Sequence, residues 1–188
     1  MKITVLGAGP GGYEAAIAAA KKGAEVTLIE KDSLGGTCLN RGCIPTKALL
    51  ASYNTYETVE KASDFGIETE GEIKIDYAKM IERKNKVVAN LVKGIHYLMD
   101  HNGVKIVNGF GKLIDSNHIE VTKEDGSVET VESDYIILAT GSVPVTPGVF
   151  KYDGKKVITS NEILDQTEPP KSLVLVGGGV IGCEIGQF

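Results

Sequence analysis

The sequence has little positive charge and no long apolar run. Its 20 Lys and Arg residues are outnumbered by 25 Asp and Glu residues, which gives a formal net charge of -5. Because nucleic acids and anionic membranes attract basic surfaces, neither is an expected partner. No apolar stretch approaches the roughly 20 residues that cross a bilayer, and the N-terminal run is too short for an export signal. We therefore expect a globular cytoplasmic protein that acts on a small molecule or another protein.

Cysteine and histidine are scarce, with three residues of each. A structural zinc site needs four ligands, and no second ligand pair stands at a recognisable spacing from Cys38 and Cys43, so we expect no metal. The close cysteine pair is then either two small buried residues or a redox-active pair, which is the usual reading in a reducing compartment. The histidines, His96, His101 and His118, fit surface or loop positions.

The periodicity of apolar residues predicts an α/β fold. A buried strand over 2–7, an alanine-rich helix ending at Gly23 and a second strand over 24–30 form a parallel βαβ unit. One helix is expected from the cysteine segment to about residue 62, a longer one over 76–103, and a short one around SNEILD (160–165). The longer helix has an approximate apolar stripe of Tyr77, Ile81, Val88, Leu91, Val92, Ile95 and Leu98. Short alternating runs from Val104 to Val131 predict an antiparallel β-meander, and buried strands are expected at 135–140 and 172–176. We divide the chain into a nucleotide-binding domain at 1–147, a connector at 148–170 and the start of a second such domain at 171–188.

Two glycine-rich turns follow predicted strands. Gly7, Gly9 and Gly12 have the G-x-G-x-x-G spacing that lets a backbone approach a pyrophosphate at a helix N-terminus, and Glu30 ends the next strand, where it could bind a ribose. The stretches 5–14 and 175–184 align without a gap, and both close on a glutamate. This internal repeat predicts a second dinucleotide site. For the first loop, the alternative is a turn of an α/β protein that binds another kind of ligand.

The segment GGTCLNRGCIPTKALL, residues 35–50, places the cysteines five positions apart. In a regular helix, five positions separate the two Cα atoms by about 8 Å, beyond the reach of a disulfide. The two thiols therefore do not pair, or the helix is irregular. Gly42 and Pro45 favour an irregular helix between Arg41 and Pro45, because glycine loosens the turn and proline removes a hydrogen-bond donor.

Other residues of this segment fit thiol chemistry. The pair Gly35-Gly36 lets the backbone approach a ligand and puts Cys38 near a helix N-terminus, where a thiolate is favoured. Lys47 lies four positions after Cys43 on the same helix face, so its cation could stabilise a thiolate or an electron-rich cofactor.

The run GGTCLNRGCIPTK resembles the redox segment of the flavoprotein disulfide reductases, the class I pyridine nucleotide-disulfide oxidoreductases. The overlapping stretch CLNRGCIPTKALL is most similar to the members that oxidise dihydrolipoamide. The stretches VLGAGPGGYEAA, VNGFGK, ATGS and VGGGVIGCEIG match the family in order. The resemblance implies a Rossmann-like FAD-binding domain and the start of a Rossmann-like NAD-binding domain. It also implies a homodimer whose partners are lipoyl-bearing proteins of 2-oxoacid dehydrogenase or glycine cleavage complexes.

The resemblance also implies roles for individual residues. The FAD-binding positions would be Gly7, Gly9, Gly12, Glu30, Lys31, Gly35, Gly36, Thr37, Cys38, Lys47, Gly111, Thr140, Gly141 and Ser142. The NAD-binding positions would be Gly177, Gly179, Val180, Ile181, Gly182 and Cys183. Cys38, Cys43 and Lys47 would be catalytic, with Cys43 as the charge-transfer thiol beside the flavin and Cys38 as the thiol that exchanges with the substrate.

The chain departs from the family in length. Members of the family are much longer and carry a His-Glu acid-base pair that no histidine of this sequence matches. We therefore expect the 188 residues to be an inactive N-terminal part of such an enzyme. The alternatives are another disulfide reductase, of the glutathione or mercuric reductase type, or a flavin-binding module without turnover.

Overall fold

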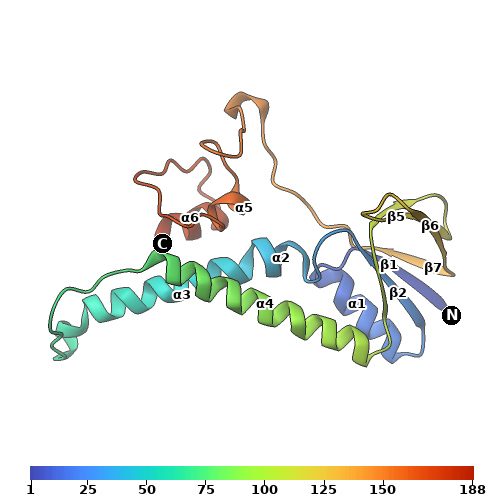
Figure 1. The fold of residues 1–188 in the computed structure, drawn as a ribbon, viewed down its shortest axis with the longest axis horizontal. Coiled ribbons are helices and arrows are strands. Elements are labelled where there is room, and N and C mark those ends of the chain that lie inside the picture. The colour runs from blue at the N-terminus through green and yellow to red at the C-terminus, as the bar shows by residue number, and fades with distance from the viewer. The chain divides into compact units, whose positions relative to one another are not determined.

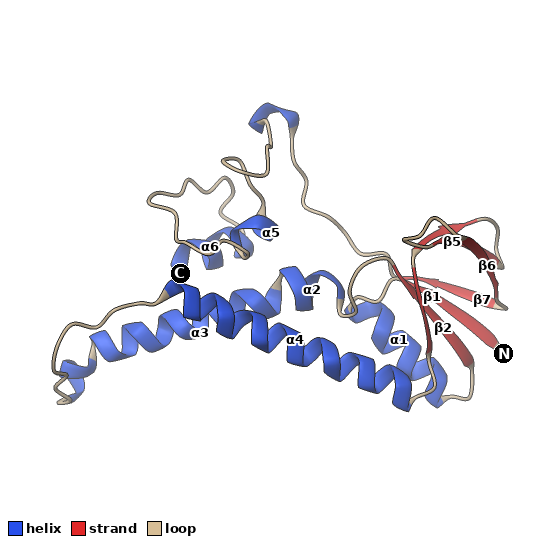
Figure 2. Cartoon of the chain, viewed as in Figure 1, coloured by secondary structure: helices blue, strands red, loops and turns tan.

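The computed structural model describes residues 1–188, which form two compact units. The first unit comprises residues 1–40 and 89–143, and the second comprises residues 41–88 and 144–188. Figures 1 and 2 show the elements along the chain. The strands are β1 (Lys2–Leu6), β2 (Glu25–Glu30), β3 (Lys105–Asn108), β4 (Phe110–Leu113), β5 (His118–Thr122), β6 (Val128–Glu132) and β7 (Tyr135–Leu138). The helices are α1 (Pro10–Lys21), α2 (Gly36–Arg41), α3 (Cys43–Glu60), η1 (Ala62–Phe65), α4 (Tyr77–His101), η2 (Gly148–Phe150), α5 (Ser160–Ile163) and α6 (Val180–Gln187).

A four-stranded parallel sheet organises the first unit. Its strand order is β3-β2-β1-β7, and each neighbouring pair is parallel. The helix α1 connects β1 to β2 and packs against both strands. Val5 of β1 and Leu28 and Ile29 of β2 are fully buried, as expected where a parallel sheet is covered on both faces. The predicted βαβ unit is therefore confirmed.

The antiparallel meander is smaller than the sequence predicts. It contains β4, β5 and β6, whereas β3 belongs to the parallel sheet, in register with β2 from Thr27 to Glu30. Gly109 makes this difference, because it adopts φ +157° and its N–H donates to the Glu30 carbonyl at 2.8 Å. The chain thus leaves the parallel sheet at residue 109 and enters the second sheet one residue later, a switch that alternation of apolar residues does not reveal.

Side chains of both sheets form the core of the first unit. The buried cluster comprises Leu6, Ile29, Val107, Ile119 and Val121, with Val131 and Ile136 packed against it. Gly111 of β4 also faces this cluster, because a Cβ there would lie 2.4 Å from Leu6 Cδ1. The absence of a side chain at position 111 therefore allows the two sheets to pack closely.

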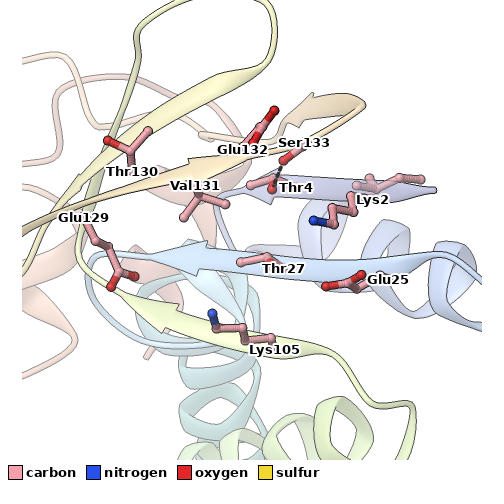
Figure 3. A pocket seen from close by; sticks show the side chains of 11 residues that line it. Lys2, Thr4, Glu25, Thr27, Lys105, Glu129, Thr130, Val131, Glu132 and Ser133 are labelled. Carbon is pink, nitrogen blue, oxygen red and sulfur yellow. Dashed lines mark hydrogen bonds between the residues drawn. The ribbon is translucent and has the colours of Figure 1, made fainter.

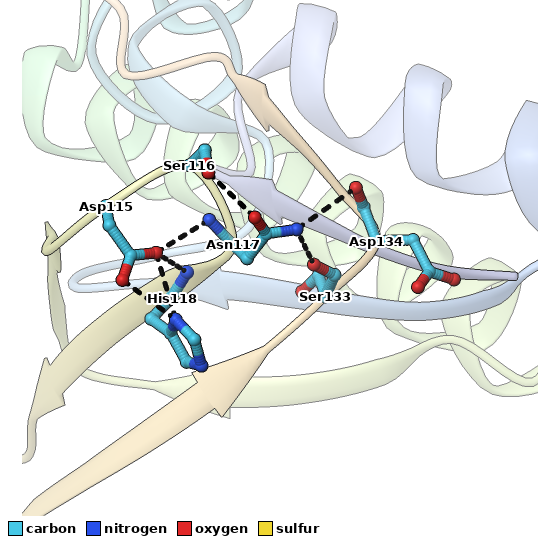
Figure 4. A network of polar contacts seen from close by, with 6 residues as sticks. All are labelled: Asp115, Ser116, Asn117, His118, Ser133 and Asp134. Carbon is cyan, nitrogen blue, oxygen red and sulfur yellow. Dashed lines mark hydrogen bonds and ion pairs between the residues drawn. The ribbon is translucent and has the colours of Figure 1, made fainter.

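A polar network holds the turn between β4 and β5 (Figure 4). Asp115 Oδ1 accepts hydrogen bonds from the backbone N–H groups of Asn117 and His118, and the His118 ring lies 2.9 Å from the same oxygen. These bonds, with the Asn117 N–H as the largest cause, lower the pKa of Asp115. The Asn117 side chain in turn donates to the Ser133 carbonyl at 2.8 Å. The network accounts for His118 as a structural residue of the turn.

The second unit contains α3 and the part of α4 before residue 89. The Arg83 side chain of α4 donates to the Ala48 carbonyl of α3 at 2.9 Å. A second buried cluster joins these helices to α5 and α6; it comprises Leu49, Ile81, Ile163, Leu164 and Ile185. The predicted short helix near residue 160 is confirmed, and Thr159 and Glu162 form a capping box at its start.

The predicted apolar stripe of α4 is only partly confirmed. Ile81 and Ile95 are buried as expected, but Leu91 and Leu98 are 43% and 41% exposed. Met99 is fully buried instead. The expected residues are not all buried because α4 spans both units, so the buried face of the helix changes along its length.

The predicted strand at 172–176 is wrong. These residues form no strand, and Val174 is 87% exposed. An extended segment becomes a strand only when its N–H and C=O groups pair with a neighbour, and this segment has none. Along the whole chain, no helix combines the length and the apolar character needed to cross a membrane.

Packing between the two sheets predicts a large cost for a cavity in β5. Replacing Ile119 with Ala should lower the free energy of unfolding by about 2 to 5 kcal/mol, because the side chain is fully buried. Val128→Ala, at an exposed position of β6 in the same meander, is the matched control and should change it by less than about 0.5 kcal/mol. Urea denaturation of both variants measures the difference. Equal losses would contradict the position of this core.

Candidate functional site

The first glycine loop joins β1 to α1. Gly7 adopts φ +100°, and its N–H donates to the Ile29 carbonyl at 2.8 Å. Gly9 is the N-cap of α1, Pro10 follows it, and no side chain caps the helix. The N–H groups of the first helical turn and the positive end of the helix dipole are therefore available to an anion.

Two contacts make glycine necessary in this loop. A Cβ on Gly12 would lie 1.8 Å from the Gly7 carbonyl oxygen, and a Cβ on Gly7 would lie 2.2 Å from the Ala139 carbonyl oxygen. The first contact brings α1 onto the turn, and the second brings the turn onto the end of β7. The loop thus lies at the carboxyl ends of β1 and β7, where open parallel sheets bind their ligands.

Glu30 is held beside this loop. Its Oε2 accepts the Ala8 N–H at 2.7 Å, and its Oε1 accepts the Asp32 N–H at 2.9 Å. Each carboxylate oxygen retains a second lone pair for a ligand hydroxyl. The predicted position of Glu30 near the glycine loop is confirmed, and the contact with Ala8 is one that the glycine spacing did not reveal.

The start of α2 approaches the same loop. The Gly35 N–H donates to the Ala8 carbonyl at 2.8 Å. Gly36 adopts φ +57°, and a Cβ there would lie 2.6 Å from the Gly9 Cα. Asn40, which sequence reasoning missed, fixes this approach because its Nδ2 donates to the Leu34 and Gly36 carbonyls at 3.0 and 2.9 Å. The two glycine stretches therefore form one surface.

The other predicted residues of the first unit have different surroundings. Thr140 lies against the loop, since a Cβ on Gly7 would be 3.2 Å from its Cα. Gly111 is instead accounted for by core packing. Lys31 Nζ lies 5.8 Å from the Phe110 ring centroid. Three further positions are exposed or have open space, and their roles stay predictions: Thr37, Gly141 and Ser142.

The helix breaks between the two cysteines. α2 ends at Arg41, α3 begins at Cys43, and Gly42 between them adopts φ -143° and ψ -114°. The predicted irregularity is confirmed, although Pro45 stands in the first turn of a new helix, where its missing N–H costs no hydrogen bond.

The two thiols differ in exposure. Cys38 in α2 is half-buried, and Cys43 is an exposed free cysteine. Tyr13 of α1 has a raised pKa, chiefly because burial disfavours its anion and then because of the charges of Glu14 and Cys38. The pairing of Cys38 with Cys43 stays a prediction.

Lys47 has a partner that sequence reasoning missed. Its Nζ forms a hydrogen-bonded ion pair with Glu184 Oε1 of α6. The Lys47 side chain is 59% exposed, so this pair contributes little to stability, and its effect is to fix the ammonium group. The sequence carried a signal for Glu184, because it is the glutamate that closes the second copy of the internal repeat.

The second glycine loop has the backbone conformation of the first. Gly177 adopts φ +109°, Gly179 is the N-cap of α6, and the Cys183 N–H donates to the Gly179 carbonyl as the Tyr13 N–H does to Gly9, both at 3.0 Å. A Cβ on Gly182 would lie 2.3 Å from the Gly177 carbonyl oxygen. The repeat is thus confirmed in the backbone. Val180 and Ile181 of this loop are 75% and 61% exposed.

Two cavities lie apart from the first glycine loop. The first unit has a polar cavity of about 280 Å³ at the amino ends of its parallel strands (Figure 3). Thr4 and Ser133, in its wall, hydrogen-bond each other. The second unit has a larger, mainly apolar cavity of about 1020 Å³, lined by the connector and by the second loop from Gly177 to Gly182. Only the second cavity includes predicted site residues.

Known proteins resemble the chain over its whole length. The profile of the family described as pyridine nucleotide-disulphide oxidoreductase matches residues 1–188. Dihydrolipoyl dehydrogenase of Acholeplasma laidlawii is 46% identical over 97% of this chain and 54% of that protein. The Bacillus subtilis (strain 168) dihydrolipoyl dehydrogenase is 44% identical over 98% of this chain and 40% of that protein.

A solved structure agrees with the fold. The crystal structure of LpdA from Mycobacterium tuberculosis superposes with a TM-score of 0.82 at 30% identity, covering 89% of this chain and 38% of that chain. The chain therefore spans about half or less of the length of these relatives.

The close contact at Gly12 predicts a sharp difference between neighbouring glycines. Gly12→Ala should lower the free energy of unfolding by about 2 to 3 kcal/mol, because its methyl group would overlap the Gly7 carbonyl. Gly11→Ala is the matched control, since a Cβ there meets nothing within 4 Å, and it should leave stability unchanged or raise it by up to about 1 kcal/mol. Guanidinium denaturation compares them. The close packing of α1 on the turn is refuted by equal stability of the two variants.

Proposed function

Since the chain belongs to the pyridine nucleotide-disulphide oxidoreductase family, we propose that it provides the flavin-binding and thiol-bearing part of a dihydrolipoyl dehydrogenase. In this proposal electrons pass from a dihydrolipoyl group through Cys38 and Cys43 to FAD and then to NAD. The observation that carries the proposal is the pair of glycine loops with one backbone conformation on either side of a cysteine pair at a helix break.

The first loop fits the pyrophosphate of FAD. Gly9 and Gly36 approach so closely that a side chain on Gly36 would overlap the Gly9 backbone, and the N-terminus of α1 has no side-chain cap. The open turn therefore offers N–H groups and space together. Glu30, held by Ala8 and Asp32, would accept hydroxyl hydrogens of the adenosine ribose. When bound, FAD would supply a two-electron acceptor that can in turn reduce NAD.

The two cysteines would perform thiol–disulfide exchange. One thiolate of the substrate attacks the Cys38 sulfur and breaks the Cys38–Cys43 bond, so that Cys43 leaves as a thiolate. The second substrate thiolate then attacks the mixed disulfide, which releases the cyclic disulfide of lipoamide and frees Cys38. The substrate loses two electrons and two protons, and the enzyme thiols gain the electrons. Cys43, at the first position of α3, benefits from the positive end of that helix.

Lys47 would support the electron-rich side of this site. It lies one helical turn after Cys43, so its ammonium faces the same side of α3. Glu184 holds that ammonium in a single ion pair. Because Glu184 follows the second glycine loop, this ion pair links the loop proposed to bind NAD to Lys47.

The proposal also covers the carrier of the substrate group and the oligomeric state. The natural substrate would be a dihydrolipoyl group carried by a protein of a 2-oxoacid dehydrogenase or glycine cleavage complex, and the enzyme would act as a homodimer. The dihydrolipoyl substrate is supported by the names of relatives that are 44 to 46% identical. We also propose that residues 1–188 alone do not turn over, since the relatives in which the activity is named are about twice as long or longer.

The proposed reaction has a direct test. The purified protein that contains this chain, loaded with FAD, should form NADH from NAD and dihydrolipoamide. Parallel assays should offer glutathione disulfide with NADPH to the same preparation. Faster oxidation of NADPH by glutathione disulfide would reject dihydrolipoamide as the substrate in favour of another disulfide reductase of the family.

The unequal roles of the thiols predict unequal spectra. In the FAD-loaded protein after two-electron reduction, a thiolate against the flavin produces long-wavelength absorbance. Cys43→Ser should abolish this absorbance. Cys38→Ser cannot form the disulfide, so it should show the absorbance before any reductant is added, because only Cys43 is proposed to face the flavin. Cys183→Ser, at the exposed third cysteine, which has no proposed contact with FAD, is the control for nonspecific effects. The reverse result would show that the two roles are exchanged.

A further inference from the structure

We propose that Lys84 is a positioning residue that sets the second glycine loop against the thiol-bearing helix α3. The proposal rests on the function proposed above and adds a residue that neither the glycine spacing nor the cysteine segment indicates. All of the residues involved belong to the second unit.

Lys84 is buried where a lysine is costly. Its side chain is only 3% exposed, although a lysine on a helix ordinarily extends its ammonium into water. It lies three residues after Ile81 and four before Val88, so it interrupts the apolar face of α4. A buried ammonium is tolerated only when its donors are used, and its partners therefore show what it does.

Those partners lie at the end of α5. Lys84 Nζ donates to the Leu164 carbonyl at 2.7 Å and to Asp165 Oδ1 at 3.1 Å. The Asp165 side chain is 75% exposed, so water screens that ion pair. The contact with the Leu164 carbonyl is the buried one, and it satisfies an acceptor at the C-terminal end of α5 that the helix leaves unpaired.

The anchored residues connect two functional elements. Ile163 and Leu164 belong to the buried cluster that also contains Leu49 of α3 and Ile185 of α6. Helix α3 carries Cys43 and Lys47, and α6 begins with the second glycine loop and carries Glu184. Figure 1 shows α5 next to α6. Lys84 therefore fixes a segment that packs in the same cluster as α3 and α6.

Stability alone does not explain this lysine. An apolar residue of similar length at a buried site is often as stabilising as a buried ion pair, whereas a buried ammonium restricts the surrounding groups to one arrangement. The hydrogen bond from Lys84 selects the position of one carbonyl, and apolar packing has no such directionality. The lysine thus serves the placement of α6 more than the strength of the core.

Hydrogen exchange of the FAD-loaded protein tests this placement without turnover. In Lys84→Met, which keeps the chain length and removes the ammonium, amides of 160–165 and 180–187 should exchange about fivefold faster or more, while those of α1 stay unchanged. Lys86→Met, at an exposed position of the same helix, should match the wild type. Asp165→Asn should also match it, because the Leu164 carbonyl keeps its donor.

Steady-state kinetics gives a second readout. In Lys84→Met the KM for NAD should rise about threefold to tenfold, the equivalent of losing one hydrogen bond, with kcat little changed. Unchanged exchange at 180–187, or faster exchange that includes α1, overturns the positioning role. An effect of Asp165→Asn as large as that of Lys84→Met overturns the assignment to the Leu164 carbonyl. If the wild type does not reduce NAD with dihydrolipoamide, the proposed function fails, and the exchange measurement still decides the role of Lys84.

Discussion

The packing of Gly12 against the Gly7 carbonyl is the contact on which the candidate site depends. With no side chain at position 12, α1 begins directly on the turn after β1, so its first N–H groups point out from the carboxyl edge of the sheet. The same approach leaves room for Gly36 beside Gly9 and holds Ala8 where Glu30 can accept its N–H. One missing methyl group thus aligns an anion site, a ribose-binding carboxylate and the start of the thiol segment.

The second glycine loop has the backbone conformation of the first, but different neighbours hold it in place. The turn at Gly177 and the start of α6 copy the first loop, but a Cβ on Gly177 meets no neighbour, whereas Gly7 is pressed against the end of β7. In place of a sheet, α6 is held by Ile185 in the apolar cluster and by the ion pair from Glu184 to Lys47. The second loop is therefore coupled to α3, and a charge at Lys84 completes that coupling.

Lys47 and Lys84 differ in exposure and in hydrogen-bond partner, and their proposed roles differ accordingly. Lys47 is mostly exposed and pairs with Glu184, so its position is defined while its ammonium stays accessible. Lys84 is enclosed and bonded to a carbonyl, which makes it a structural anchor. The apolar positions around Lys84 do not by themselves predict its burial, because burial depends on which elements pack against each helix.

The sequence by itself determined the features that depend on local backbone chemistry. Glycine spacing and Glu30 at the end of β2 predicted the turns, and Gly42 with Pro45 predicted the break between the cysteines. Only the tertiary structure decided the features that depend on a neighbour distant in the chain. These are the transfer of β3 from the meander to the parallel sheet, the failure of 172–176 to form a strand, the pairing of Glu184 with Lys47 and the burial of Lys84. A turn is specified by the conformations its own residues allow, whereas a strand pairing or a buried charge is specified by the partner that supplies the hydrogen bond.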